Sequence, residues 1–281
     1  MKAHHCWSRN ILSILALLAW TLPGVSQPPS EADEGWIPLF NGEDLEGWTP
    51  KIAGYELGEN PGEIFRVEDG LLVASHERLD RFDNRFGHLF HETPYSHYRL
   101  RLEYRFVGEQ APGGPEWALR NNGVMIHSQP PETMRRDQSF PVSIEVQLLG
   151  GDGSAERPTG NLCTPGTHVV MNGQLWTPHV TDSSSPTYHG DQWVRMEIEV
   201  LGDRRIRHWI NDELVLEYEQ TQYDPQDGDA QRMIRDDDLR LSGGYIALQA
   251  ESHPTHFRAI ELLPLDPGET PHHQTPVDPP Q

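Results

Sequence analysis

The chain has 281 residues, with 22 Lys and Arg against 43 Asp and Glu, and its formal net charge at pH 7 is −21. Nucleic acids and anionic membrane surfaces are bound by clustered Lys and Arg, so this acidic balance argues against both as partners. Two cysteines, Cys6 and Cys163, exclude a scaffold held together by several disulfides. The 25 Gly and 24 Pro exceed the usual share and favour a turn-rich β protein.

The first residues have the pattern of a secretory signal peptide. Lys2 and Arg9 precede an apolar run over 11–19, which is followed by Pro23. The run is much shorter than the roughly 20 residues that span a membrane, so we expect cleavage near Ser26 rather than anchoring. The sequence therefore predicts a signal peptide over 1–26 and a periplasmic or secreted protein, with no membrane insertion after cleavage.

Composition divides the rest of the chain into one domain and two flanks. Residues 27–34 and 266–281 are polar and rich in Pro, which predicts a flexible linker and a disordered tail. Residues 35–265 contain no repeat and no break in composition. We expect them to form one domain.

Within this domain, period-two alternation bounded by turn residues predicts short antiparallel strands. In chain order we expect strands over 65–67, 71–73, 98–106, 123–128, 143–148, 169–171, 174–176, 193–200, 206–210, 214–218, 245–250 and 257–263. The pairs Asp69-Gly70 and Asn172-Gly173 favour tight hairpin turns. Helical periodicity is weak, and residues 226–238 are expected as an acidic surface helix or loop. The pattern predicts an all-β sandwich of two antiparallel sheets.

The strand over 143–148 has an unusual polar face. Its aliphatic residues alternate with Ser143, Glu145 and Gln147. Glu145 and Gln147, side by side on one face, could line a concave groove, or they could belong to an ordinary solvent-exposed face.

The strand over 123–128 contains a histidine. Strict alternation places Met125 and His127 on one face and Val124 and Ile126 on the other. A histidine there is either an acid/base residue or a structural one. The later histidines do not have the His-x-x-x-His spacing of a zinc helix, so no zinc site is indicated.

Three further features leave alternatives open. The loops over 150–153 and 224–229 are acidic or Gly-rich without EF-hand spacing, so weakly bound calcium stays open. After loss of Cys6, Cys163 is expected as a small buried residue rather than a thiol nucleophile. Trp176 and other tryptophans can stack on sugar rings or pack in the core.

Several segments in this order resemble the 3-keto-disaccharide hydrolase domain family. The segments are 36–48, 65–72, 143–147, 159–160, 193–200, 244–249 and 257–260, so the resemblance covers about 36 to 264. It implies a concanavalin A-like, jelly-roll β-sandwich and substrates that are sugars oxidised at C3, such as 3-keto-trehalose or 3-keto-sucrose.

The resemblance also implies a chemistry. A ketone at C3 acidifies the proton on C2, and its removal allows the C1 substituent to leave before water adds back; direct hydrolysis by two carboxylates is a variant. By resemblance, Glu145 and His127 are the candidate acid/base residues. The candidate substrate-binding residues are Gln147, Asn122, His168 and Trp176. A divalent cation such as calcium is left open as a cofactor, and no metal ligand is assigned. The alternative function is a non-catalytic carbohydrate-binding module of the same fold.

Overall fold

The computed structural model describes residues 35–268. The predicted signal peptide over 1–26, the linker over 27–34 and residues 269–281 of the predicted tail lie outside the described residues. Among the residues described, no helix is long and apolar enough to cross a membrane.

The described residues form strands connected by loops and short 3-10 helices. The strands are β1 (Ile37–Pro38), β2 (Trp48–Ile52), β3 (Phe65–Glu68), β4 (Leu71–Ala74), β5 (Gly87–His91), β6 (His97–Phe106), β7 (Asn121–Ser128), β8 (Ile144–Leu149), β9 (Asn161–Cys163), β10 (Thr167–Met171), β11 (Gln174–Trp176), β12 (Val180–Thr181), β13 (Val194–Leu201), β14 (Ile206–Ile210), β15 (Glu213–Tyr223), β16 (Tyr245–Ala250) and β17 (Thr255–Pro264). The 3-10 helices are η2 (Pro61–Glu63), η3 (Glu116–Ala118), η4 (Pro131–Thr133) and η5 (Ala230–Arg232).

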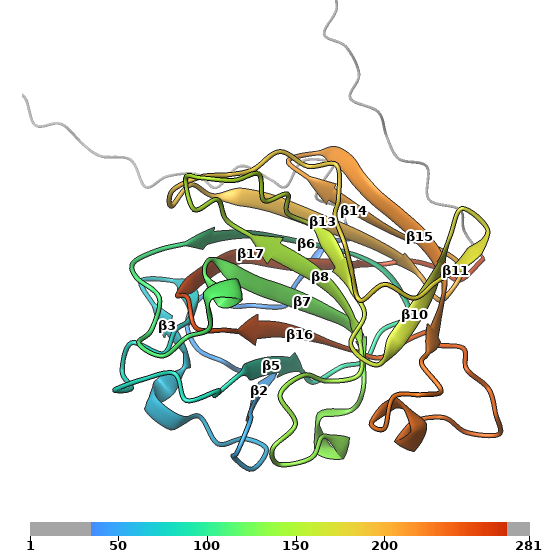
Figure 1. Cartoon of the computed structure of the whole chain (residues 1–281), viewed down its shortest axis with the longest axis horizontal. Helices are drawn as coiled ribbons and strands as arrows, with labels where there is room; N and C mark the ends of the chain where they lie inside the picture. The colour runs from blue at the N-terminus through green and yellow to red at the C-terminus, as the bar shows by residue number, and fades with distance from the viewer. Residues whose placement is uncertain (1–34, 269–281) are drawn as a thin grey trace, which may run out of the picture. The chain divides into compact units, whose positions relative to one another are not determined.

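Two antiparallel sheets pack against each other (Figure 1). The larger, ten-stranded sheet has the order β11-β10-β15-β14-β13-β6-β17-β4-β3, with β1 paired to β17. The smaller, seven-stranded sheet has the order β12-β9-β8-β7-β16-β5-β2. The predicted all-β sandwich of two antiparallel sheets is confirmed, and residues 226–238 form a loop that contains η5.

Strand β5 was not expected from the sequence. All of its five residues are buried, so it has no solvent-exposed face and shows no period-two alternation. It lies between β16 and β2 in the smaller sheet. Its absence from the predicted strands follows from burial on both sides.

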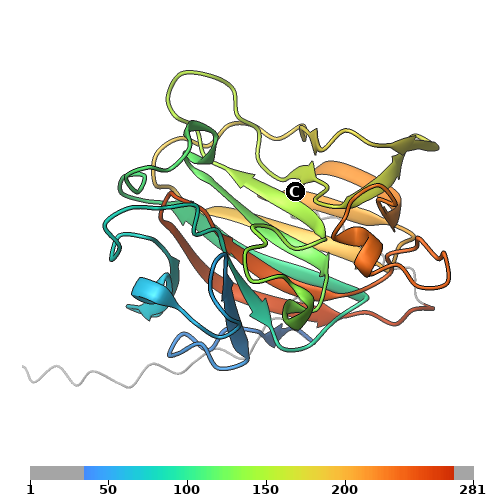
Figure 2. The same ribbon diagram turned by 60° about the horizontal axis from the view of Figure 1, so that its bottom comes forward.

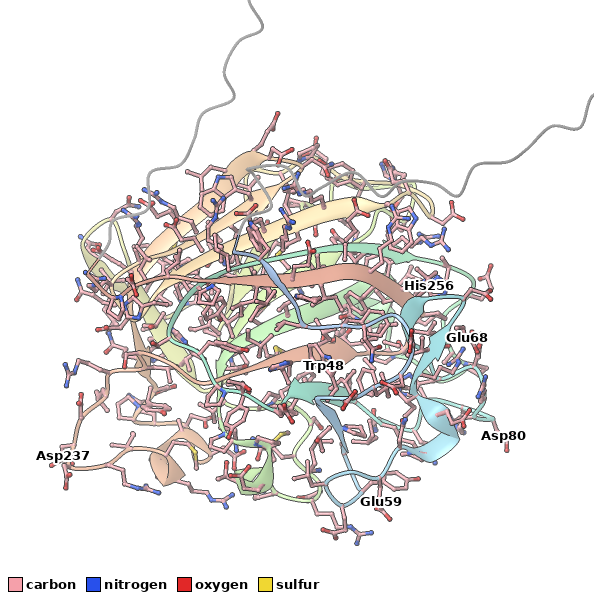
Figure 3. All side chains as sticks on the ribbon, turned by 180° about the vertical axis from the view of Figure 1, so that it is seen from behind. Trp48, Glu59, Glu68, Asp80, Asp237 and His256 are labelled. Atoms are coloured by element: carbon pink, nitrogen blue, oxygen red, sulfur yellow. The ribbon has the colours of Figure 1, made fainter. Side chains whose placement is uncertain are left out.

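The core lies between the sheets and is built from alternate residues of each strand. Along β6 every second residue is buried, and this face meets the buried side chains of Val124, Ile144 and Ile246 on the smaller sheet. At the rim of the sandwich, the indole Nε1 of Trp48 donates a hydrogen bond to the carbonyl of Leu39 at 2.7 Å (Trp48 is labelled in Figure 3).

Alternation along β8 decides which side chains are free for chemistry. Ile144, Val146 and Leu148 are fully buried in the core between the sheets. Glu145 and Gln147 therefore point from the other face of the smaller sheet. In Figure 2, loops cross in front of this face of the smaller sheet.

Candidate functional site

A cavity of about 540 Å³ lies on the outer face of the smaller sheet. It is lined by side chains from β7, β8, β9 and β12, by the residue after β16, and by the intervening loops. These residues are Trp117, Asn121, Phe140, Glu145, Gln147, Leu149, Arg157, Asn161, Cys163, Pro165, His179, Val180, Asp182 and Glu251. The cavity therefore brings together segments that are far apart in the sequence.

Glu145 is the first of two buried acids at this cavity. It is 6% exposed, and on the neighbouring strands it pairs with Met125 and Cys163. Its side chain lies against Gly123, where an added Cβ would come within 2.8 Å of its Cγ. Burial raises the pKa of Glu145 from 4.5 to about 8. The carboxyl therefore keeps its proton at neutral pH in most molecules.

Glu251 is the second acid. It is 2% exposed, and its Oε2 has no hydrogen-bond partner among residues 35–268. Burial raises its pKa well above the usual value, the nearby Glu145 raises it further, and Arg157 lowers it. Two carboxylates at one cavity repel each other, so the pair holds at least one proton near neutral pH.

Amides and a guanidinium surround the two acids. Gln147 accepts a hydrogen bond from Nδ2 of Asn161 at 3.1 Å through its Oε1, which leaves its own Nε2 to donate into the cavity. Arg157 donates to the carbonyl of Gly150 at 2.7 Å. The cavity thus places hydrogen-bond donors beside the two carboxyl groups of Glu145 and Glu251.

The apolar part of the wall is aromatic. Trp117, on η3, is 54% exposed and its ring stacks on Phe86 with centroids 5.7 Å apart. An exposed indole face of this kind suits a sugar ring. Burial raises the pKa of the Cys163 thiol, which therefore stays protonated and is a poor nucleophile, as expected from the sequence.

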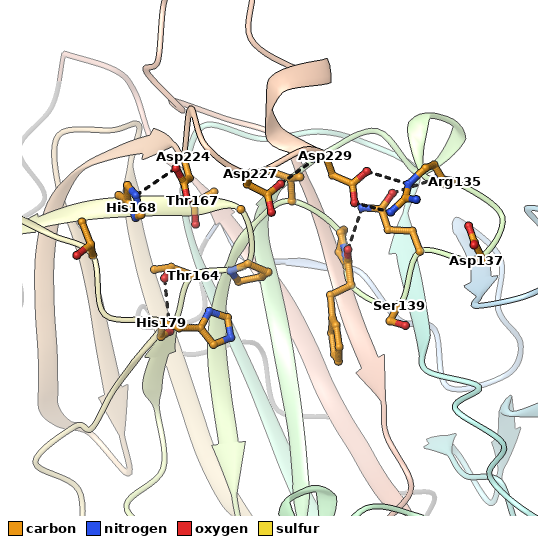
Figure 4. A pocket seen from close by; sticks show the side chains of 17 residues that line it. Arg135, Asp137, Ser139, Thr164, Thr167, His168, His179, Asp224, Asp227 and Asp229 are labelled. Atoms are coloured by element: carbon orange, nitrogen blue, oxygen red, sulfur yellow. Dashed lines mark hydrogen bonds and ion pairs between the residues drawn. The ribbon is translucent and has the colours of Figure 1, made fainter.

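A second cavity of about 530 Å³ adjoins the first, and the two share Phe140, Pro165 and His179 (Figure 4). Its wall contains an ion pair between His168 and Asp224, with Nε2 and Oδ1 3.4 Å apart. Further along the wall, Arg135 donates two hydrogen bonds of 2.9 Å to Asp229, as the dashed lines in Figure 4 show.

Two of the sequence-predicted residues face the core instead of the cavity. His127 has φ of +50° at a β-bulge, and its Nε2 bonds the carbonyl of Gly202 at 3.0 Å. The expectation that His127 shares a face with Met125 is therefore wrong, because the bulge interrupts the alternation. Burial lowers the pKa of His127 to about 4.

Asn122 is fully buried with its amide satisfied by protein atoms. Its Nδ2 donates to the carbonyl of Gln249 at 2.8 Å and to Thr255 at 3.1 Å, and its Oδ1 accepts from the amide of Gly123. The neighbouring Asn121 lines the cavity instead. The structure therefore gives Asn122 a structural position.

The remaining sequence-predicted residues are distributed over both cavities and beyond them. Gln147 lines the cavity of Glu145, whereas His168 lines the second cavity. Trp176 lines neither, and its Nε1 donates to the Thr181 hydroxyl at 2.7 Å.

Sequence reasoning missed Glu251, Arg157 and Asn161, and it named Trp117 only among the tryptophans that can stack on sugar rings or pack in the core. A signal existed for Glu251, because alternation along β16 places Ala247, Gln249 and Glu251 on one face. Arg157 and Trp117 come from loops, where no periodicity predicts direction. Within residues 35–268 no group of three or more His, Cys, Asp or Glu side chains is arranged to hold a metal ion.

The raised pKa of Glu145 makes the folded protein less stable at high pH. The unfolded chain releases this proton near pH 4.5 and the folded chain near pH 8, so stability falls as pH rises between these values. We expect Glu145→Gln to remove this loss of stability at high pH, because Gln has no proton to release. The variant should gain unfolding free energy over wild type by up to about 1.4 kcal/mol per pH unit across the window.

Urea denaturation at about pH 4.5, 6, 7 and 8.5 measures this difference. The exposed Glu213, changed to Gln, is the matched control and should show no such trend. Parallel stability curves for Glu145→Gln and wild type would contradict the expected buried, protonated carboxyl.

Comparison with known proteins identifies the domain. The family model described as the 3-keto-alpha-glucoside-1,2-lyase-like domain matches residues 35–263. No curated protein matches the chain.

Solved structures share the fold at low identity. A provisionally assigned glycosyl hydrolase from Parabacteroides distasonis is 18% identical with a TM-score of 0.50, covering 85% of this chain and 99% of that chain. A second protein so assigned from the same organism is 19% identical with a TM-score of 0.45, covering 82% and 99%. A Bacillus subtilis protein of unknown function with a galectin-like fold is 13% identical with a TM-score of 0.46, covering 82% and 94%.

The first of these likenesses agrees with the concanavalin A-like sandwich that the resemblance implied. The family match extends over nearly all of the described residues and includes both acids of the cavity. The chain belongs to the 3-keto-alpha-glucoside-1,2-lyase-like domain family.

Proposed function

We propose that this protein is a carbohydrate-active enzyme that breaks the C1–O bond of 3-keto-glycosides, by elimination across C1 and C2 and then hydration. The observation that carries this proposal is the pair of buried acids, Glu145 and Glu251, at one cavity of a domain of this family. An elimination followed by hydration needs one group that accepts a proton and one that donates a proton.

The elimination uses the two acids in opposite roles. Glu145, once ionised, removes the proton from C2, and the electron pair is delocalised onto the oxygen at C3. The C1=C2 double bond then forms as the C1–O bond breaks. The departing oxygen takes a proton from Glu251, whose pKa burial raises well above its usual value.

Hydration returns both acids to their starting states. The Glu251 carboxylate accepts a proton from the water that attacks C1, and Glu145 returns its proton to C2. Elimination and hydration together consume one water and release the free 3-keto sugar and the alcohol. The two acids end with the protons they began with.

The oxygen at C3 becomes negatively charged after proton removal. Nε2 of Gln147 and the guanidinium of Arg157 are the donors at the cavity that can stabilise this charge. Donors that the protein holds in place contribute strongly to such stabilisation. Trp117 offers its exposed face to the sugar ring.

Turnover of defined substrates tests the proposal. We expect the protein to release glucose from 3-keto-trehalose and fructose from 3-keto-sucrose, and to leave trehalose and sucrose intact. Because Glu145 must be ionised to act as a base, kcat/KM should fall up to about tenfold per pH unit below pH 8.

Two control arms separate the alternatives. EDTA treatment shows whether a divalent cation is needed. Saturable binding of both 3-keto sugars without any release would instead favour the carbohydrate-binding module.

A further inference from the structure

Two side chains of the smaller sheet are fully buried with all of their polar atoms unpartnered. Gln249 and His88 are both 0% exposed. Neither the oxygen nor the nitrogen of the Gln249 amide, and neither ring nitrogen of His88, has a hydrogen-bond partner among residues 35–268. Burying such groups without partners destabilises a fold, because they lose their hydrogen bonds to water and gain none in return.

These two residues lie next to the cavity of the two acids. Gln249 and His88 are directly paired across β16 and β5, and Gln249 is on the same face as Glu251, two residues later. Unpartnered polar atoms also occur at the cavity wall itself, namely Oε2 of Glu251 and Oδ1 of Asn121. The unpartnered groups thus extend inward from the wall of the open cavity.

One aromatic ring of the cavity wall also lies against the inner pair. The ring of Phe140, which lines the cavity, lies with its centroid 6.0 Å from that of His88. Phe140 also contacts Phe86 at 4.8 Å, and Phe86 stacks on Trp117. Phe140 is only partly buried, so its ring can shift without opening the main core.

Another buried amide in the smaller sheet shows that the fold can satisfy such groups. Asn122, also 0% exposed, uses both its nitrogen and its oxygen in hydrogen bonds. Because the fold satisfies the amide of Asn122, the unpartnered amide of Gln249 points to a role other than stabilising the fold. Unpartnered groups of this kind often mark a functional site.

We propose that Gln249 and His88 form an inner subsite that binds the hydroxyl groups of the sugar ring after the ring of Phe140 moves aside. An amide donates and accepts, and so does a neutral imidazole, which matches hydroxyl groups that also do both. This subsite deepens the function proposed above and rests on it, because its ligand is the 3-keto sugar whose C1 and C2 then face the two acids.

The test separates binding from folding. The variant Gln249→Met removes the amide at nearly constant shape, and Asn122→Leu is the matched control for a satisfied amide. Both are made in the wild-type background for turnover and in the Glu145→Gln background for binding, because loss of the base keeps 3-keto-trehalose from being converted during the measurement. Calorimetry gives Kd for 3-keto-trehalose, and thermal denaturation gives Tm.

We expect Gln249→Met to keep or raise Tm and to weaken binding of 3-keto-trehalose at least tenfold, and Asn122→Leu to lower Tm. An unchanged Kd for folded Gln249→Met overturns the subsite. If wild type turns over 3-keto-trehalose and Gln249→Met does so equally well, the subsite is wrong and the proposed function stands. If wild type neither binds nor converts the sugar, both proposals fail.

A second measurement does not depend on how Gln249→Met folds. Imidazole resonances of His88, assigned by comparison with His88→Phe, should shift when 3-keto-trehalose is added to Glu145→Gln. Resonances that stay fixed at saturating sugar overturn the proposal.

Discussion

Replacing Glu145 by Gln is expected to lower kcat/KM for 3-keto-trehalose by about 10²–10⁴-fold while binding of the sugar changes little. The amide fills the same volume in the cavity but cannot accept the C2 proton. The fold should persist, because the carboxyl makes no hydrogen bond among the described residues and is buried at a cost.

Steady-state release of glucose measures this loss, and calorimetry with 3-keto-trehalose measures binding. The exposed Glu213→Gln serves as the control and should match wild type in both. Because the two acids act in one reaction, adding Glu251→Gln should reduce activity less than the product of the single losses. Near-wild-type turnover by folded Glu145→Gln would remove Glu145 from the mechanism.

Replacing Gly123 by Ala is expected to lower kcat/KM by about 10–100-fold without replacing any proposed reactive group. The added Cβ would come within 2.8 Å of Cγ and 2.9 Å of Cδ of Glu145, so the carboxyl has to move. Gly123 is not among the residues with positive φ, and its backbone accepts alanine. The loss therefore reports the position of the carboxyl.

Gly228→Ala is the matched control, because a Cβ at Gly228 would meet no atom within 4 Å. We expect it to retain wild-type turnover. The kinetic signature of Gly123→Ala is a lower kcat with a pH profile whose midpoint shifts, because a displaced carboxyl changes its burial. Unchanged kcat and pH profile would mean that the position of Glu145 does not matter for the reaction.

The sequence was informative where a strand has one apolar and one polar face. Along β8 the aliphatic residues enter the core, and this alone directs Glu145 and Gln147 to the opposite face. The same alternation predicted β6, and the Asp69-Gly70 turn predicted the hairpin of β3 and β4. The sequence was not informative for β5, where burial on both faces removes the alternation.

The site was harder to predict than the fold because three physical features hide it. The bulge at His127 turns one side chain to the other face, and no residue type in the segment signals it. Asn122 lies two residues before Val124 and so points to the same, inner face of the strand. The adjacent Asn121 points to the outer face and lines the cavity. Glu251 lies one residue past the end of β16, where a search confined to the predicted strand stops.

The alternation along β8 has a consequence for redesign of the cavity. Consecutive residues of one strand have different surroundings, since Ile144 and Val146 pack the sandwich while Glu145 and Gln147 line the cavity. A library that varies only the second set leaves the interior volume untouched. Substrate preference could therefore be altered at Gln147 with a small loss of folding free energy, whereas an equal number of changes at the intervening positions would unfold the domain.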